Sequence, residues 1–298
     1  MPSQIQSPIL PFMQSIADSC FRLAPERTAC LQSLVDLHRF EIELVNEKFF
    51  SVRVLLDQHK ILLPVSALEY LWTCCLRYWV IAVEYGKTQH EGKSHFDVYG
   101  NDRLKNSADI ISWGFNNMQK GGTEDWPQAL PKPCIQPIPQ SDEHVANELF
   151  VGAMGWILLH EIAHIELRHS HASGVLSQKE EKEADLFATR WVLDGMNEND
   201  PCFRKRAYCI AAALLCLQSL ELGSTSTCGH NHPPAYERLD YCLSPYRTGG
   251  EWDKINAFMV SNLQLLYSAA GVKANTEGET LATIIDDMLF DFSRKSQS

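Results

Sequence analysis

The pentapeptide His160-Glu161-Ile162-Ala163-His164 is the part of the chain best suited to chemistry. Because an α-helix turns by about 100° per residue, His160 and His164 would lie one turn apart on one face, with Glu161 beside them. Two imidazoles at this spacing can bind one Zn²⁺ at ~2.0–2.1 Å and leave a carboxylate next to an open coordination position. The HExxH pattern therefore predicts a hydrolytic zinc site, whereas the alternative is a buried helix with coincidental histidines.

A catalytic zinc site needs a third protein ligand. The longer pattern HExxHxxGxxH is excluded, because Leu167 and Ser170 stand where it requires glycine and histidine. The segment EKEAD at 181–185 is the other source of a ligand. Glu181 and Asp185 lie one turn apart on one face of a second predicted helix, and alanines share that face, which would let this helix pack closely against the first.

Glu181 is therefore the predicted third ligand, and it completes a His₂Glu set with one position open. Glu180 and Glu183 are the competing candidates. Asp185 is predicted to accept the free ring N–H of a ligand histidine, which would fix the tautomer of that ring. The alternative for Asp185 is a solvated charge on the helix surface.

The predicted reaction follows from these parts. Zn²⁺ lowers the pKa of its bound water, Glu161 takes the proton as the water attacks a carbonyl, and the metal stabilises the developing oxyanion. Glu161 can then pass the proton to the leaving amine. These residues predict a zinc-dependent endopeptidase that holds one Zn²⁺ per chain and acts on a protein substrate.

The segment HNHPPAYER, which starts at His230, offers further polar groups. His232 and Tyr236 are candidates for an oxyanion donor or a substrate contact, and Arg238 is a candidate for a structural or substrate contact. Tyr236 and Arg238 could instead pack the start of a helix. A second metal cluster formed by Cys228, His230 and His232 is a further alternative.

Composition limits the class of protein that carries this site. The chain has 298 residues and a formal net charge of −11, which argues against nucleic acid as the main partner. Its ten cysteines form no CxxC pair, so buried free thiols are expected rather than a disulfide framework. The longest apolar runs are interrupted or too short for a membrane span. We expect a cytoplasmic protein without a membrane span.

The elements that must position the site indicate an α+β fold. Alternating apolar and polar residues at 40–45 and 52–56 predict two strands, and the apolar run at 61–65 is a candidate for a third; together they predict a small antiparallel sheet in the N-terminal half. Residues 121–140 are rich in proline and predict an extended connection. We expect an N-terminal α+β region over 1–120 and a mostly helical, zincin-like metallopeptidase region over 141–298, together forming one integrated catalytic unit. Helices are predicted at 66–85, 101–119, 141–170, 177–194, 204–221, 252–270 and 278–294.

With HEIAH, EKEAD and HPPAYER in this order, the C-terminal half is similar to zinc metallopeptidases of the Glu-zincin (gluzincin) class. More narrowly, the chain resembles the phage-exclusion peptidase Lit family. The shared segments cover most of residues 23–240, and they are VSALEYLW, HFDVYG, WILLHEIAHIEL, EKEADLFATRW, CLQSLE and HPPAYER.

That resemblance implies a role in antiviral defence by abortive infection. Such enzymes are latent until a phage capsid-derived peptide is present, and they then cleave the translation elongation factor EF-Tu. It also implies that His160, His164 and Glu181 bind zinc and that Glu161 is catalytic. Two alternatives remain open, namely a zinc peptidase that cleaves a regulatory protein such as a repressor, and a non-catalytic zinc-containing binding module.

Overall fold

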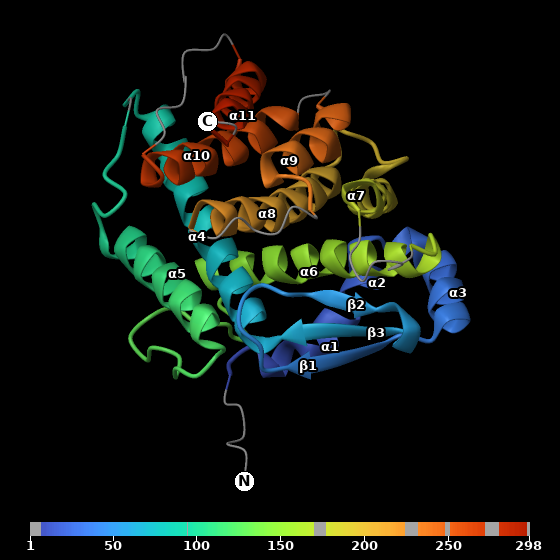
Figure 1. Ribbon diagram of the computed structural model, residues 1–298. Coiled ribbons are helices and arrows are strands. Elements are labelled where there is room, and N and C mark those ends of the chain that lie inside the picture. The colour runs from blue at the N-terminus through green and yellow to red at the C-terminus, as the bar shows by residue number, and fades with distance from the viewer. Residues whose placement is uncertain are drawn as a thin grey trace.

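The computed structural model describes residues 7–93, 95–169, 177–223, 232–247, 251–271 and 280–296. Three strands form one small sheet near the N-terminal end, and helices make up most of the remaining described residues (Figure 1). The strands are β1 (Glu41–Val45), β2 (Arg53–Leu55) and β3 (Lys60–Pro64). The predicted α+β class is confirmed, and the strands lie within a residue or two of their predicted ranges.

The sheet is mixed, which corrects the prediction of an antiparallel sheet. Its strand order is β1-β3-β2. Strands β2 and β3 are antiparallel with Val54 opposite Ile61, whereas β1 and β3 are parallel with Ile42 opposite Ile61. The reason is burial, because β3 carries the most apolar and most buried run and therefore takes the central position. Residues 46–52 carry the chain past β3 to its far edge instead of forming a tight hairpin.

The helices predicted from the pattern all occur. Helix α9 and the helices before β1 are additions, because these helices have only five to eleven residues, too few turns for a helical period to stand out in the sequence. The bounds are α1 (Met13–Ala17), α2 (Ser19–Leu23), α3 (Thr28–His38), α4 (Val65–His90), α5 (Asp102–Lys120), α6 (Asp142–Glu166), α7 (Gln178–Leu193), α8 (Pro201–Gly223), α9 (Ala235–Leu243), α10 (Trp252–Ala269) and α11 (Leu281–Ser296).

Helix α6 runs across the middle of the molecule, with the sheet on one side and α8 on the other (Figure 1). It also packs against α2, α4 and α7. Two glycines allow the closest approaches: a Cβ at Gly155 would lie 2.9 Å from the carbonyl oxygen of Ser19 in α2, and a Cβ at Gly152 would lie 2.2 Å from Sγ of Cys209 in α8. The hydrophobic core around α6 is continuous from α4 to α10, so the helix that carries the HExxH motif is held on several sides.

Helices α6 and α8 are both long and apolar enough to cross a membrane by length and composition. In the folded chain, 89% of the apolar window of α6 and 61% of that of α8 are buried inside the protein. Their hydropathy is therefore explained by their place in the core. The nine cysteines within the described residues are free thiols, as the composition predicts, and six of them are buried.

Candidate active site

Helix α6 places the HExxH side chains in the interior. The helix begins at its N-cap Ser141, whose hydroxyl accepts from the amide of His144, and it continues through an apolar run of about four turns. His160, Glu161 and His164 stand near its C-terminal end with 6%, 7% and 1% of their surface exposed. Burying three titratable groups is costly unless each has a partner, so their neighbours decide what the site can do.

Helix α7 supplies the acidic neighbours. It begins with a capping box in which the Ser177 hydroxyl accepts from the Glu180 amide and the Glu180 carboxylate accepts from the Ser177 amide. The Glu180 carboxylate is therefore used at the start of the helix, and Glu180 is not the third metal ligand. Glu181 and Asp185 are 1% and 0% exposed, and the buried alanines at 184 and 188 lie on the packed side of α7. The close packing expected between the two helices is therefore present.

The ligand atoms of His160, His164 and Glu181 come together, all within 4.8 Å of one another. The two Nε2 atoms lie 3.1 Å apart. Glu181 Oε2 lies 3.4 Å from His160 Nε2, and Glu181 Oε1 lies 3.7 Å from His164 Nε2. Two histidines from α6 and one carboxylate from α7 thus form a group that could hold a metal ion, with the membership predicted from the sequence.

Asp185 lies behind His160, with its Oδ1 2.9 Å from His160 Nδ1. Arg238 of α9 donates from Nε to Oδ2 at 2.8 Å and from Nη2 to Oδ1 at 2.6 Å. The hydroxyl of Tyr241 also donates to Oδ2, at 2.5 Å. Such a paired arginine satisfies a buried carboxylate, so Asp185 is a buried, fully engaged group rather than a solvated surface charge.

The electrostatics of this cluster follow from burial and pairing. Burial lowers the pKa of His160, but its contacts with Asp185 and Glu181 outweigh burial and raise that pKa to about 10. Burial and the charge of His160 lower the pKa of His164 to about 3. Burial raises the pKa of Asp185, but Arg238 and His160 outweigh it and hold that pKa at about 2. Without a bound cation, the two neighbouring carboxylates thus favour the protonated form of His160.

Glu161 has a different environment from the other carboxylates. Burial and the negative charge of Glu181 raise its pKa to about 7, although the neighbouring side chains of His160 and His232 act to lower it. The nearby backbone of Val54 in β2 also lowers the pKa of this carboxyl group. A carboxylate with a pKa near neutrality can both accept and return a proton at physiological pH, which is what a general base that later acts as an acid requires.

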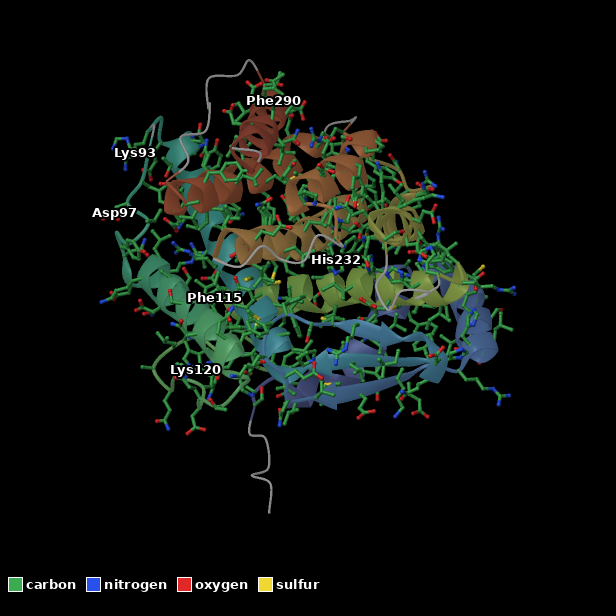
Figure 2. The ribbon with its side chains drawn as sticks, viewed as in Figure 1. Lys93, Asp97, Phe115, Lys120, His232 and Phe290 are labelled. Atoms are coloured by element: carbon green, nitrogen blue, oxygen red, sulfur yellow. The ribbon has the colours of Figure 1, made fainter. Side chains whose placement is uncertain are left out.

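The structure places the three candidate residues His232, Tyr236 and Arg238 in three different environments. His232 is 60% exposed, and its Nδ1 lies 2.9 Å from Glu181 Oε2; in the view of Figure 2 it lies between the ribbons of α6 and α8. Tyr236 is buried, and its hydroxyl donates to Glu237 at 3.2 Å. Arg238 pairs with Asp185 and so acts behind the ligand set. Cys228 and His230 of the alternative metal cluster lie outside the described residues.

Sequence reasoning missed several groups that touch the site. Tyr241 stands three residues after Arg238 on the same face of α9, a spacing that could have identified it. Val54 could not have been found, because its contribution comes from a backbone group that only the folding of β2 onto α6 brings near Glu161. His169, which follows α6, is also part of the site: its Nδ1 lies 2.8 Å from His164 Nδ1, and its Nε2 lies 3.3 Å from Glu183.

Comparison with known proteins supplies the family. The sequence model of the family described as Peptidase U49 matches residues 61–259. The chain is 38% identical over 294 residues to the protein named "Cell death peptidase" from Escherichia coli (strain K12), an alignment that covers 97% of this chain and 99% of that protein. No solved structure matches the chain. The matched region contains α6, α7 and α9, the helices that carry His160, Glu181 and Arg238.

Proposed function

The chain belongs to the peptidase U49 family, and from that premise we propose that it is a zinc-dependent endopeptidase. The observation that carries the proposal is the convergence of His160, His164 and Glu181 within 4.8 Å, with the buried Glu161 next to them. Membership of a peptidase family supports proteolytic activity, and the two imidazoles and one carboxylate support the binding of a zinc ion. A site with two imidazoles, one carboxylate and a free fourth position is the arrangement that catalytic zinc uses.

The donor atoms fit a zinc ion by their spacing. Ligands at ~2.0–2.1 Å around a tetrahedral ion lie roughly 3.3–3.4 Å from one another. The nearest distances within the group are 3.1, 3.4 and 3.7 Å, and these values bracket the expected one. Asp185, 2.9 Å from His160 Nδ1, supplies the carboxylate that commonly orients a ligand histidine.

The side chains divide the work as follows. His160, His164 and Glu181 would hold the ion, which when bound makes water acidic near neutral pH and polarises a carbonyl. Glu161 accepts the proton of the attacking water, because burial keeps the pKa of its carboxyl near 7. Glu161 then returns the proton to the nitrogen of the leaving amine, and His232 at the exposed rim is placed to contact the substrate.

Strand β2 is a natural place for an extended substrate. It is an edge strand of the sheet, and Figure 1 shows it on the side of the sheet that faces α6. A peptide that adds to such an edge is held by main-chain hydrogen bonds and needs little side-chain specificity. Because β2 packs against α6, a peptide running along β2 would bring its backbone carbonyls close to the helix that carries Glu161.

For substrate and trigger, we propose EF-Tu in the cytoplasm and a phage capsid-derived peptide, in an abortive-infection role. This rests on the resemblance to the Lit family and on the "Cell death" name of the relative. The test incubates the purified chain with EF-Tu, with and without the capsid peptide, and identifies new termini by mass spectrometry. Cleavage that needs the peptide supports the proposal, and new termini in a repressor of a cell lysate but not in EF-Tu would favour the regulatory alternative.

Glu161→Gln is the matched inactive variant for this assay, because the amide keeps the size of the side chain and cannot accept the proton. It should bind zinc as wild type does and cut no substrate. Cleavage at a rate near that of wild type would exclude Glu161 as the base. A wild-type chain that binds zinc but cleaves neither EF-Tu nor any lysate protein with the peptide present would favour the binding module.

A further inference from the structure

The end of α6 has a specific geometry that places one residue against a ligand histidine. Leu167 is the C-cap, and Arg168 follows in the left-handed region with φ 56°. The amide of Arg168 donates to the carbonyl of Ile165 at 3.2 Å, and the amide of His169 donates to the carbonyl of His164 at 3.0 Å. These two bonds define a Schellman motif. In that motif the second residue after the cap packs on the third residue before it.

In this chain those two residues are both histidines. His169 packs on His164 with ring centroids 5.0 Å apart and the two Nδ1 atoms at 2.8 Å, a hydrogen-bond distance. His164 is 1% exposed and His169 is 8% exposed. A hydrophobic contact usually occupies this position of the motif, so a buried pair of polar rings is a departure that needs a reason.

The other side of the His169 ring faces α7. Its Nε2 lies 3.3 Å from Oε2 of Glu183, whose side chain is 45% exposed. Helix α7 therefore places three carboxylates against the three histidines. Glu181 lies near the Nε2 atoms of His160 and His164, Asp185 lies near Nδ1 of His160, and Glu183 lies near Nε2 of His169. Glu183 was a competing candidate for the metal ligand, and the structure gives it this different neighbour.

We propose that His169, backed by Glu183, is a positioning residue that holds His164 in the tautomer able to bind a cation. The proposal rests on the proposed function, because it requires His164 Nε2 to be a metal ligand. A ligand Nε2 must carry a lone pair, so the ring proton of His164 must be on Nδ1. That N–H donates to Nδ1 of His169, which places the proton of His169 on Nε2, the atom that faces the Glu183 carboxylate.

The two ligand histidines would then be oriented by different devices. His160 has the buried Asp185, which Arg238 and Tyr241 hold in place. His164 contacts the imidazole of His169 instead, and the carboxylate in this case is that of the partly exposed Glu183, which lies on the far side of His169. Partners of this kind around metal ligands are worth 10–100-fold in metal affinity when they are removed. Deleting His169 should therefore weaken zinc binding even though it touches no metal.

The test measures zinc affinity of the full chain by competition with a chromophoric chelator, beside the thermal unfolding of the metal-free protein. His169→Leu should weaken zinc binding about 10–100-fold. His169→Asn keeps an acceptor oxygen near the Nδ1 position and should recover most of that loss. Glu183→Ala should weaken binding less than His169→Leu. The double variant should bind as His169→Leu does, because Glu183 acts through His169.

Lys179→Met is the matched control, since this exposed lysine lies 3.6 Å from Glu183 and touches neither histidine; its affinity should stay within about twofold of wild type. The Co²⁺-loaded protein gives a second readout, because the visible spectrum of His169→Leu should differ from that of wild type and of His169→Asn. Zinc affinity of His169→Leu equal to that of wild type would overturn the proposal, as would equal losses in His169→Leu and His169→Asn.

The failures of the two proposals can be told apart. If wild type binds one zinc that His164→Ala loses while His169→Leu keeps it at full affinity, the zinc site stands and the positioning role of His169 is wrong. If wild type binds no zinc, both are wrong.

Discussion

Arg238→Met tests whether the charge network behind the metal ligands is as buried and as coupled as the structure has it. The substitution keeps much of the apolar length of the side chain but removes both hydrogen bonds to Asp185, at 2.8 and 2.6 Å. Asp185 is 0% exposed and Arg238 is 7% exposed. Removing one partner of such a buried ion pair costs about 3–5 kcal/mol, because the remaining charge has lost its compensation.

This loss of unfolding free energy corresponds to a decrease in the melting temperature, Tm. At roughly 2.1 cal/mol/K per residue, a chain of 298 residues has an unfolding entropy of about 0.6 kcal/mol/K. A loss of about 3–5 kcal/mol therefore lowers Tm by about 5–8 °C. The assay is thermal unfolding of the metal-free chain, followed by circular dichroism, so that a change in zinc binding does not enter.

The control is Arg190→Met, which removes an exposed guanidinium from α7 and should move Tm by less than about 1 °C. If Arg238→Met behaved like Arg190→Met, the buried pairing of Asp185 would be refuted, and with it the reason for the low pKa of Asp185 and the raised pKa of His160.

Three further predictions concern other parts of the chain. Because the pKa of His160 is raised to about 10 without metal, zinc must displace a proton from it; zinc affinity should rise about tenfold per pH unit from pH 6 to 8, and a flat profile in chelator competition would contradict this. Arg168→Gly relieves the left-handed backbone at φ 56° and should raise the free energy of unfolding by about 0.5–1 kcal/mol in urea titration, whereas a decrease would argue against strain there. Gly152→Ala would place a Cβ 2.2 Å from Cys209 Sγ and should cost about 1–3 kcal/mol; Cys209→Ala in the same chain should recover part of it, and full stability of the single variant would refute the close packing.

The spacing of residues in the sequence was sufficient to predict α6 and α7, the two helices that carry the candidate metal ligands. The i, i+4 spacing of His160 and His164 places both rings on one face of α6, and the spacing of Glu181 and Asp185 does the same on α7. The helical period also predicted α6 and α7 to within a few residues. Once two helices of that kind must pack through small residues, the ligand set follows without knowledge of the rest of the fold.

What could not be predicted depends on contacts between distant segments or on backbone groups. The parallel pairing of β1 with β3 depends on which strand takes the buried centre of the sheet, and alternation alone does not reveal that. The effect of the Val54 backbone on Glu161 has no side-chain signature. His169 was missed because the left-handed residue that follows the C-cap of α6 is Arg168 rather than a glycine, so the sequence carries no signal for the motif that folds His169 back onto His164.

The zinc content of the purified chain, measured by elemental analysis beside three single variants, tests the central claim most directly. Wild type and Glu161→Gln should each hold one zinc per chain, because Glu161 is not a ligand, and His164→Ala and Glu181→Ala should lose it after dialysis. Zinc absent from wild type, or retained at full stoichiometry in both ligand variants, would contradict the assignment of His160, His164 and Glu181 as the metal site.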